Sequence, residues 1–267
     1  MSIPRLLLGT ALVAALSMPL VGQQKTTGYY EVACVKVNPG QNHAFSEWID
    51  GTGHKLDQES VDSGRFKSTI ALRAVSPQGT AATCDYVFLE FFNGLPPEAG
   101  SRESLATALQ KAGIAMTPDE FYAKRGELTT LVNITYSQTQ SQVGEAKKGD
   151  YIVVNQIGAP DIGACLAYEK KVWQPLAEEL MNAGDTGGWT TEVQVFPSGA
   201  KDGPRVSSAD FYPSLDALFK VYDSIGTAWK KVHPDMDINS TIGQFGKLCP
   251  IEHTALFKVA DMVTAKK

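Results

Sequence analysis

The chain has 267 residues, of which 43% are hydrophobic and 20% are charged, and this composition excludes disordered and fibrous proteins. Its formal net charge of −5 at pH 7 excludes a basic nucleic-acid-binding surface, so we expect no nucleic-acid partner. Glycine-rich nucleotide-binding motifs, HExxH and GxSxG are absent from the sequence, which removes the usual signatures of nucleotide binding, zinc proteases and α/β-hydrolases.

Residues 1–22 contain one cation, Arg5, followed by an apolar run from Leu6 to Val21 with Pro19 near its end. This pattern is typical of a secretory signal peptide, and no later apolar run is long enough to span a membrane. We therefore expect an exported protein, periplasmic or extracellular, with no membrane span once the signal peptide is removed. The alternative is an N-terminal anchor helix that stays attached.

A sequence pattern recurs after about 120 residues, which indicates an internal repeat. His54-Lys55-Leu56 aligns with Gln174-Pro175-Leu176, and Val75-Ser76-Pro77 with Val195-Phe196-Pro197. The pattern divides the mature chain into a first repeat at 28–136, a polar linker at 137–149 and a second repeat at 150–263.

Each repeat is predicted to run strand, helix, strand, strand, helix, strand, from the change between alternating and helical apolar spacing. In the first repeat we expect strands at 29–37, 68–75, 84–92 and 128–136, and helices at 41–63, 101–111 and 118–125. In the second we expect strands at 150–157, 189–196, 205–211 and 253–260, and helices at 161–183 and 214–232.

Helix signals are strongest in the second repeat. Asp161 can cap the helix that follows it, and Pro175 should bend that helix or remove one of its hydrogen bonds. The last helix should begin near Ser214 and end at His233, because a residue before proline disfavours helical geometry.

A βαββαβ unit packs two helices on one face of an antiparallel sheet and leaves the other face apolar and exposed. Two such sheets in one chain can cover each other. The predicted fold is therefore α+β, with two tandem βαββαβ ferredoxin-like units whose antiparallel sheets pack together.

This tandem pattern resembles the dimeric α/β-barrel superfamily, in its fused two-repeat form. The residues that carry the resemblance are YYEVACVKVNPG at 29–40, Trp173 to Leu176, Ala183-Gly184 before Trp189, and AWKKVHPDMD at 228–237. Members of the superfamily include cofactor-free monooxygenases, haem-binding and haem-degrading proteins and chlorite dismutases. The resemblance implies an intramolecular α/β barrel with a small-molecule cavity, without selecting a chemistry.

Four cysteines occur, Cys34, Cys84, Cys165 and Cys249, none in a CxxC motif. Export would favour structural disulfides over free thiols, but the sequence alone leaves three pairings open. The topology that the resemblance implies brings Cys34 near Cys84 and Cys165 near Cys249, so these are the pairs we expect.

The sequence has four histidines, which are candidates for metal-binding or catalytic roles. His43, Glu47, Asp50 and His54 share a helical stripe that could hold a metal, but a solvated helix face explains the stripe better, and we predict no metal site. His253, beside Glu252, could be a general base or a haem ligand, although a satisfied rim histidine is the simpler interpretation.

Polar residues inside predicted strands need partners or a cavity if they are buried. They are Arg73, Glu90, Asn133, Asn155, Glu192, Gln194 and Lys258. Those that point between helices and sheet, beside large aromatic residues, would line an apolar pocket, although plain core packing is the simpler interpretation of the aromatics. Our ligand-binding candidates are His54, Arg73, Asn155, Tyr168, Trp173, Trp189 and His253.

These observations predict an exported protein that binds a small apolar or aromatic molecule between helices and sheet, as a monomer or weak homo-oligomer. One alternative is an oxidoreductase, either a cofactor-free monooxygenase or a haem protein with His253 or His54 as ligand. The other is a structural module with no ligand and a large exposed apolar patch.

Overall fold

The computed structural model describes residues 28–96, 100–198 and 205–265. The signal peptide expected at 1–22 therefore lies outside the described residues. Within the described ranges, the helices are all too short or too polar to cross a bilayer.

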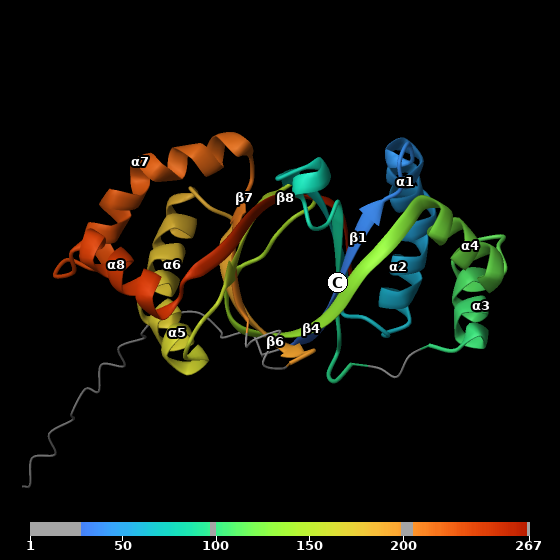
Figure 1. Ribbon diagram of the computed structural model, residues 1–267, viewed down its shortest axis with the longest axis horizontal. Coiled ribbons are helices and arrows are strands. Elements are labelled where there is room, and N and C mark those ends of the chain that lie inside the picture. Colours follow the sequence, from blue (N-terminus) through green and yellow to red (C-terminus); the bar gives the residue numbers. More distant parts are fainter. Residues whose placement is uncertain (1–27, 97–99, 199–204, 266–267) are drawn as a thin grey trace, which may run out of the picture.

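Eight strands form one closed antiparallel barrel, with helices packed against its outside (Figure 1). The strands are β1 (Tyr29–Val37), β2 (Ser68–Ser76), β3 (Tyr86–Phe91), β4 (Thr129–Gly144), β5 (Tyr151–Ile157), β6 (Gly188–Phe196), β7 (Val206–Tyr212) and β8 (Ile251–Thr264). Around the barrel they follow the order β1-β3-β2-β8-β5-β7-β6-β4, and β4 pairs with β1 to close it. Such closure leaves one enclosed interior rather than a layer between two stacked sheets.

The helices lie in two groups on opposite sides of the barrel (Figure 1). One group contains α1 (Asn42–Trp48), the π-helical turn η1 (Ile49–Gly53), α2 (His54–Asp62), α3 (Arg102–Lys111) and α4 (Pro118–Leu128), with the 3-10 turn η2 (Gly79–Ala81) between β2 and β3. The other contains α5 (Ile162–Tyr168), the π-helical turn η3 (Glu169–Trp173), α6 (Gln174–Ala183), α7 (Leu215–Val232) and α8 (Ile238–Leu248).

Two long strands join the halves of the barrel edge to edge. β4 pairs with β1 through its first part and with β6 from Tyr136 to Gly144, while β8 pairs with both β5 and β2. The expected linker at 137–149 is therefore wrong over residues 137–144, which continue β4. These residues are polar because part of this strand faces the barrel interior. The segment is therefore a strand although it has few apolar residues.

A π-helical turn interrupts the first helix of each half. Pro175 has no N–H to donate and stands in the first turn of α6, directly after η3. η1 contains no proline, so proline alone does not explain these turns. At Gly53 a Cβ atom would lie 3.3 Å from the ring and the carbonyl oxygen of Trp48, so the absent side chain allows this tight approach.

Helix α8 was not predicted. Its sequence contains Gly243 and Gly246, which weaken the helical signal. Residues at its two ends stabilise the helix. Asp237 caps its N-terminus, and Cys249 at its C-terminus forms a disulfide with Cys165. Tertiary contacts thus override a weak local preference.

Both expected disulfides are present. Cys34–Cys84 joins β1 to the segment before β3, with Cα atoms 5.3 Å apart, and Cys165–Cys249 joins α5 to the end of α8, with Cα atoms 5.4 Å apart. Each bridge thus stays within one half of the chain.

Candidate functional site

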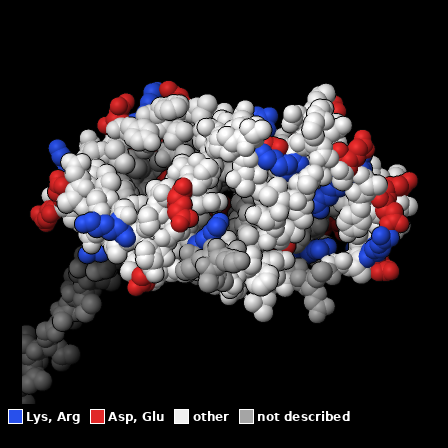
Figure 2. All heavy atoms as spheres, in the orientation of Figure 1, with Lys and Arg blue, Asp and Glu red and all other residues white. Residues whose placement is uncertain are grey.

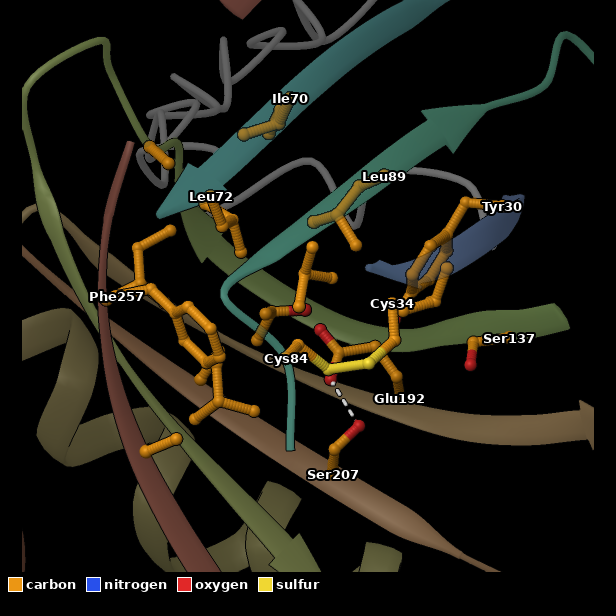
Figure 3. Close-up of a pocket in the computed structure, with 18 of the residues that line it drawn as sticks. Tyr30, Cys34, Ile70, Leu72, Cys84, Leu89, Ser137, Glu192, Ser207 and Phe257 are labelled. Carbon is orange, nitrogen blue, oxygen red and sulfur yellow. Dashed lines mark hydrogen bonds between the residues drawn. A yellow bond between two sulfur atoms is a disulfide. The ribbon is translucent and has the colours of Figure 1, made fainter. Parts of the chain in front are cut away.

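A cavity of about 670 Å³ lies inside the barrel (Figure 3). Its size falls in the range of small-molecule binding sites. The cavity is bounded by the inward-facing side chains of the strands, so it lies on the other side of the sheet from the helix layers where we expected a pocket.

One part of the cavity wall is apolar. It is built by alternate side chains of β2, β3, β5 and β8, among them Ile70, Leu72, Val87, Leu89, Ile152 and Phe257. Successive residues of a strand point to opposite faces, so the intervening residues face the helices. An apolar molecule placed here would be removed from water on this side.

The wall contributed by β4 and β6 is polar. Its inward-facing residues are Asn133, Thr135, Ser137, Thr139, Gln142, Thr190, Glu192 and Gln194. Most are small hydroxyl or amide side chains that can both donate and accept hydrogen bonds. The cavity is therefore amphipathic, with groups that could orient a ligand.

Glu192 is the most deeply buried charged group of this wall, with 7% of its surface exposed. The Ser207 hydroxyl donates a hydrogen bond to its carboxyl group at 3.1 Å. Burial raises the pKa of Glu192 to about 7, although Thr190 and Ser207 oppose the shift. Near neutral pH this carboxyl can therefore release or accept a proton.

Tyr30 lies on the same side of the cavity as Glu192 (Figure 3). Its ring stacks on Phe91 with a centroid distance of 4.8 Å, and 6% of its surface is exposed. Burial raises the pKa of the Tyr30 phenol well above its usual value, Glu192 adds to the shift, and a hydrogen bond with Ser137 opposes it. The phenol therefore stays protonated at neutral pH.

The Cys34–Cys84 disulfide also faces the cavity, beside Tyr30 and Glu192 (Figure 3). Four further ionisable residues border it: Lys67, Glu145, Arg205 and His253. Lys67 and Arg205 are exposed, so they mark its solvent-facing border.

Of the ligand-binding residues expected from the sequence, only His253 borders this cavity. His54 lies outside the barrel with its Nδ1 atom 2.7 Å from Oδ2 of Asp261, which also accepts a hydrogen bond from Lys148. Although burial opposes the shift, the bonds from Lys148 and His54 lower the pKa of Asp261. Arg73 is exposed, and the half-buried Asn155 accepts a hydrogen bond from Thr254 on the face of β5 opposite the cavity.

The three expected aromatic residues lie in the helix layer of the second half. Tyr168 donates a hydrogen bond to the carbonyl oxygen of Thr241, and Trp173 contacts Trp229 and Phe245. Trp189 is 3% exposed and belongs to a small cluster with Val143 and Ala177. The structure does not bring these side chains together with His253.

Sequence reasoning singled out Glu192, Asn133 and Gln194 as polar strand residues but placed none of them among the ligand-binding candidates. Their position inside predicted strands was the available signal. Tyr30 was missed, because a tyrosine in a strand is as typical of ordinary packing as of a site.

A second group of buried acids lies outside the cavity, between sheet and helices. Burial, with Asp210 and Glu192 nearby, raises the pKa of Glu169 to about 8, and burial raises that of Asp210 to about 7. In the first half, burial and Asp261 raise the pKa of Asp57 to about 7, and burial and Glu31 raise that of Glu90 to about 7. No cluster of the described residues has the arrangement of a metal site.

The cavity fits haem poorly. Its cysteines are disulfide-bonded, and His54 lies outside it. In the strand register, His253 on β8 pairs with Gln156 on β5, which pairs with Ser207 on β7. Ser207 in turn pairs with Glu192 on β6. Polar groups thus occupy the wall beside the imidazole, where a porphyrin would need apolar contacts. The residues of this cavity therefore do not suit haem.

No protein-family model matches the chain, and no curated protein matches it in sequence. Solved structures show the fold. A candidate monooxygenase from Lactobacillus acidophilus superposes with a TM-score of 0.55 and 10% identity, covering 90% of this chain and 97% of the other. A candidate monooxygenase from Fusobacterium nucleatum also has a TM-score of 0.55 and 10% identity, covering 90% and 95%. An anthrone oxidase-like protein has a TM-score of 0.50 and 14% identity, covering 90% and 94%.

Proposed function

We propose that the barrel interior binds a small molecule with an apolar body and a polar end. The supporting observation is the cavity of about 670 Å³, with an apolar wall from β2, β3, β5 and β8 facing a polar wall from β4 and β6. The apolar body would pack against the first wall, and the polar end would hydrogen-bond to the second. A module without a ligand would need no such interior.

Filling the cavity tests this proposal. We expect Ala209→Trp, and independently Val154→Phe, to abolish the rise in melting temperature that a screen of aromatic compounds produces in the unaltered protein, because both side chains line the cavity. Asn155→Ala, next to Val154 on β5 but on the face opposite the cavity, is the matched control and should keep the response. Binding that survives both filling variants but is lost in Trp173→Phe would move the site to the helix layer and overturn the proposal.

A second candidate function is cofactor-free oxidation of a bound phenol or enol by dioxygen. Glu192 would accept the substrate proton, and dioxygen would accept the electrons of the resulting anion. The structural similarity to a candidate monooxygenase and to an anthrone oxidase-like protein, together with the buried carboxyl of Glu192, supports this candidate. Oxygen uptake with phenols or anthrones, lost in Glu192→Gln while the aromatic compound still binds, would support oxidation. Uptake that persists in this variant would exclude Glu192 as the base.

We also propose that the chain is a duplication of one βαββαβ ferredoxin-like unit, covering 28–136 and 150–263. Three parallels support it: each half follows the same order of strands, each has a π-helical turn in its first helix, and Tyr30 opposite Phe91 corresponds to Ile152 opposite Phe211.

Export is proposed from the signal-like residues 1–22, and both disulfides agree with an oxidising compartment. N-terminal sequencing of the protein from a periplasmic or culture fraction should begin near residue 23. A chain that keeps its first residues would instead indicate an N-terminal anchor.

A further inference from the structure

The carboxyl group of Glu192 has hydrogen-bond support but no counter-charge. Ser207 donates to it, while no lysine, arginine or histidine in the described part of the chain forms an ion pair with it. Its ionisable neighbours, Tyr30 from β1 and Glu169 from η3, are neutral or acidic groups. A carboxylate buried without a cation is costly, so a positive charge brought by a ligand would be strongly favoured here.

Basic groups do border the cavity, but none of them is among the hydrogen-bond or ion-pair partners of this carboxyl. Lys67 precedes β2 and Arg205 precedes β7, and both are exposed. His253 is on β8, which is separated from β6 by β7 and β5. Glu145, a further acid, also borders the cavity. None of the basic groups contributes to the pKa shift of Glu192, so they do not neutralise it.

Aromatic faces complete this part of the cavity. Tyr30 and Phe91 form a stacked pair, and Phe211 on β7, the strand next to Glu192, also borders the cavity. The negative potential of an aromatic face attracts ammonium groups, and recognition of amines commonly combines such faces with an acid. Figure 3 shows the ring of Tyr30 and the carboxyl of Glu192 on one side of the cavity.

We propose that the ligand of the barrel is an apolar amine, whose protonated nitrogen pairs with Glu192 beside Tyr30 while its hydrocarbon body packs on the apolar wall. This inference rests on the proposed function, because it specifies the chemistry of the same cavity.

Three isosteric probes test the inference: 2-(1-naphthyl)ethylamine, which is cationic, 2-(1-naphthyl)ethanol, which is neutral, and 1-naphthylacetate, which is anionic. Calorimetry at pH 8 with the full mature chain should give the amine an affinity at least about tenfold higher than the alcohol, with the anion weakest. The preference should shrink as pH falls to 5.5, since Glu192 then becomes protonated.

Glu192→Gln should reduce the ratio of amine to alcohol affinity to near one, while Glu90→Gln, which changes a carboxyl outside the cavity whose pKa is also raised to about 7, should preserve it. Equal affinity for all three probes, lost in Ala209→Trp, would overturn the amine inference and leave the proposed function intact. Preference for the anion would likewise overturn it. Absence of binding by the three probes, together with a negative aromatic screen, would overturn both.

Discussion

At the scale of single residues, the main feature is a set of acids buried where their charge is poorly compensated. Glu192 faces the cavity, whereas Glu169 and Asp210 lie on the helix side of the sheet. Their pKa values are raised mainly by burial, which is typical of functional sites but also occurs in structural networks. The position of Glu192 in a cavity distinguishes it from the others.

Glu192 should make the folded state less stable as pH rises. Its pKa is 4.5 in the reference state and about 7 when folded, so the folded protein binds more protons between these values. Its contribution to the free energy of unfolding is therefore complete below pH 4.5 and is lost as pH rises through about 7. Urea unfolding of Glu192→Gln between pH 5 and 8 should show a smaller loss of stability, by up to a few kcal/mol.

Glu127→Gln provides the control for this measurement, because Glu127 is exposed and pairs with Lys124. This variant should follow the pH dependence of the unaltered protein. The same slope in Glu192→Gln would show that this carboxyl does not titrate as described.

At the scale of elements, short helices depend on their ends and on tertiary contacts. α8 begins at a cap in which the Asp237 side chain accepts a hydrogen bond from the backbone N–H of Ser240 at 2.8 Å. Such a bond satisfies one of the free N–H groups of the first helical turn. α8 packs on α5 and carries Phe245, whose ring contacts Tyr168 and Trp173.

We expect Asp237→Ala to lower the free energy of unfolding by roughly 1 kcal/mol through loss of this cap. Asp235→Ala, two residues earlier and outside the helix, is the matched comparison and should have a much smaller effect. Chemical denaturation monitored by circular dichroism measures both. Equal stability of the two variants would show that the cap contributes little.

At the scale of the whole molecule, the ladder between β4 and β6 joins the two halves of the barrel. The last pair of this ladder is Gly144 opposite Gly188, and both residues have positive φ angles, 68° and 150°. A Cβ atom on Gly188 would collide with the carbonyl oxygen of Val143, and one on Gly144 with that of Gly187. Glycine at both positions lets the backbones approach closely enough to complete the barrel.

Gly188→Ala should therefore destabilise the protein by more than about 2 kcal/mol, because it adds backbone strain to a steric clash. Gly126→Ala on α4 is the opposite case: a Cβ atom there meets nothing within 4 Å, so this change should be neutral or slightly stabilising. Thermal unfolding compares the two variants. If Gly188→Ala leaves stability unchanged, the end of the β4–β6 ladder can open without loss of the fold.

Closure within one chain also bears on assembly. The barrel uses both halves of a single polypeptide, so a second copy is not needed to cover the sheet. We expect light scattering of the purified protein to give the mass of one chain at micromolar concentration. A stable dimer would show that another surface mediates association.

Sequence patterns alone were sufficient for the strands and helices whose signals are local. The alternating run at 29–37 predicts β1, and Asp161 and Ser214 act as the caps of α5 and α7. The strands and helix starts follow from apolar spacing and capping, which act between residues close in the chain. The α+β barrel and both disulfide pairs were expected from the family resemblance instead.

Only the tertiary structure decided where the cavity lies and which residues face it. The polar composition of residues 137–144 is typical of a loop. Only the pairing of this segment with β6 and its inward face identify it as a strand. The same is true of Glu192, since the direction of one strand side chain depends on register, and register is set by partners distant in sequence. The spacing of apolar residues along the chain therefore determined the helices and strands, whereas closure of the barrel determined which side chains face the cavity.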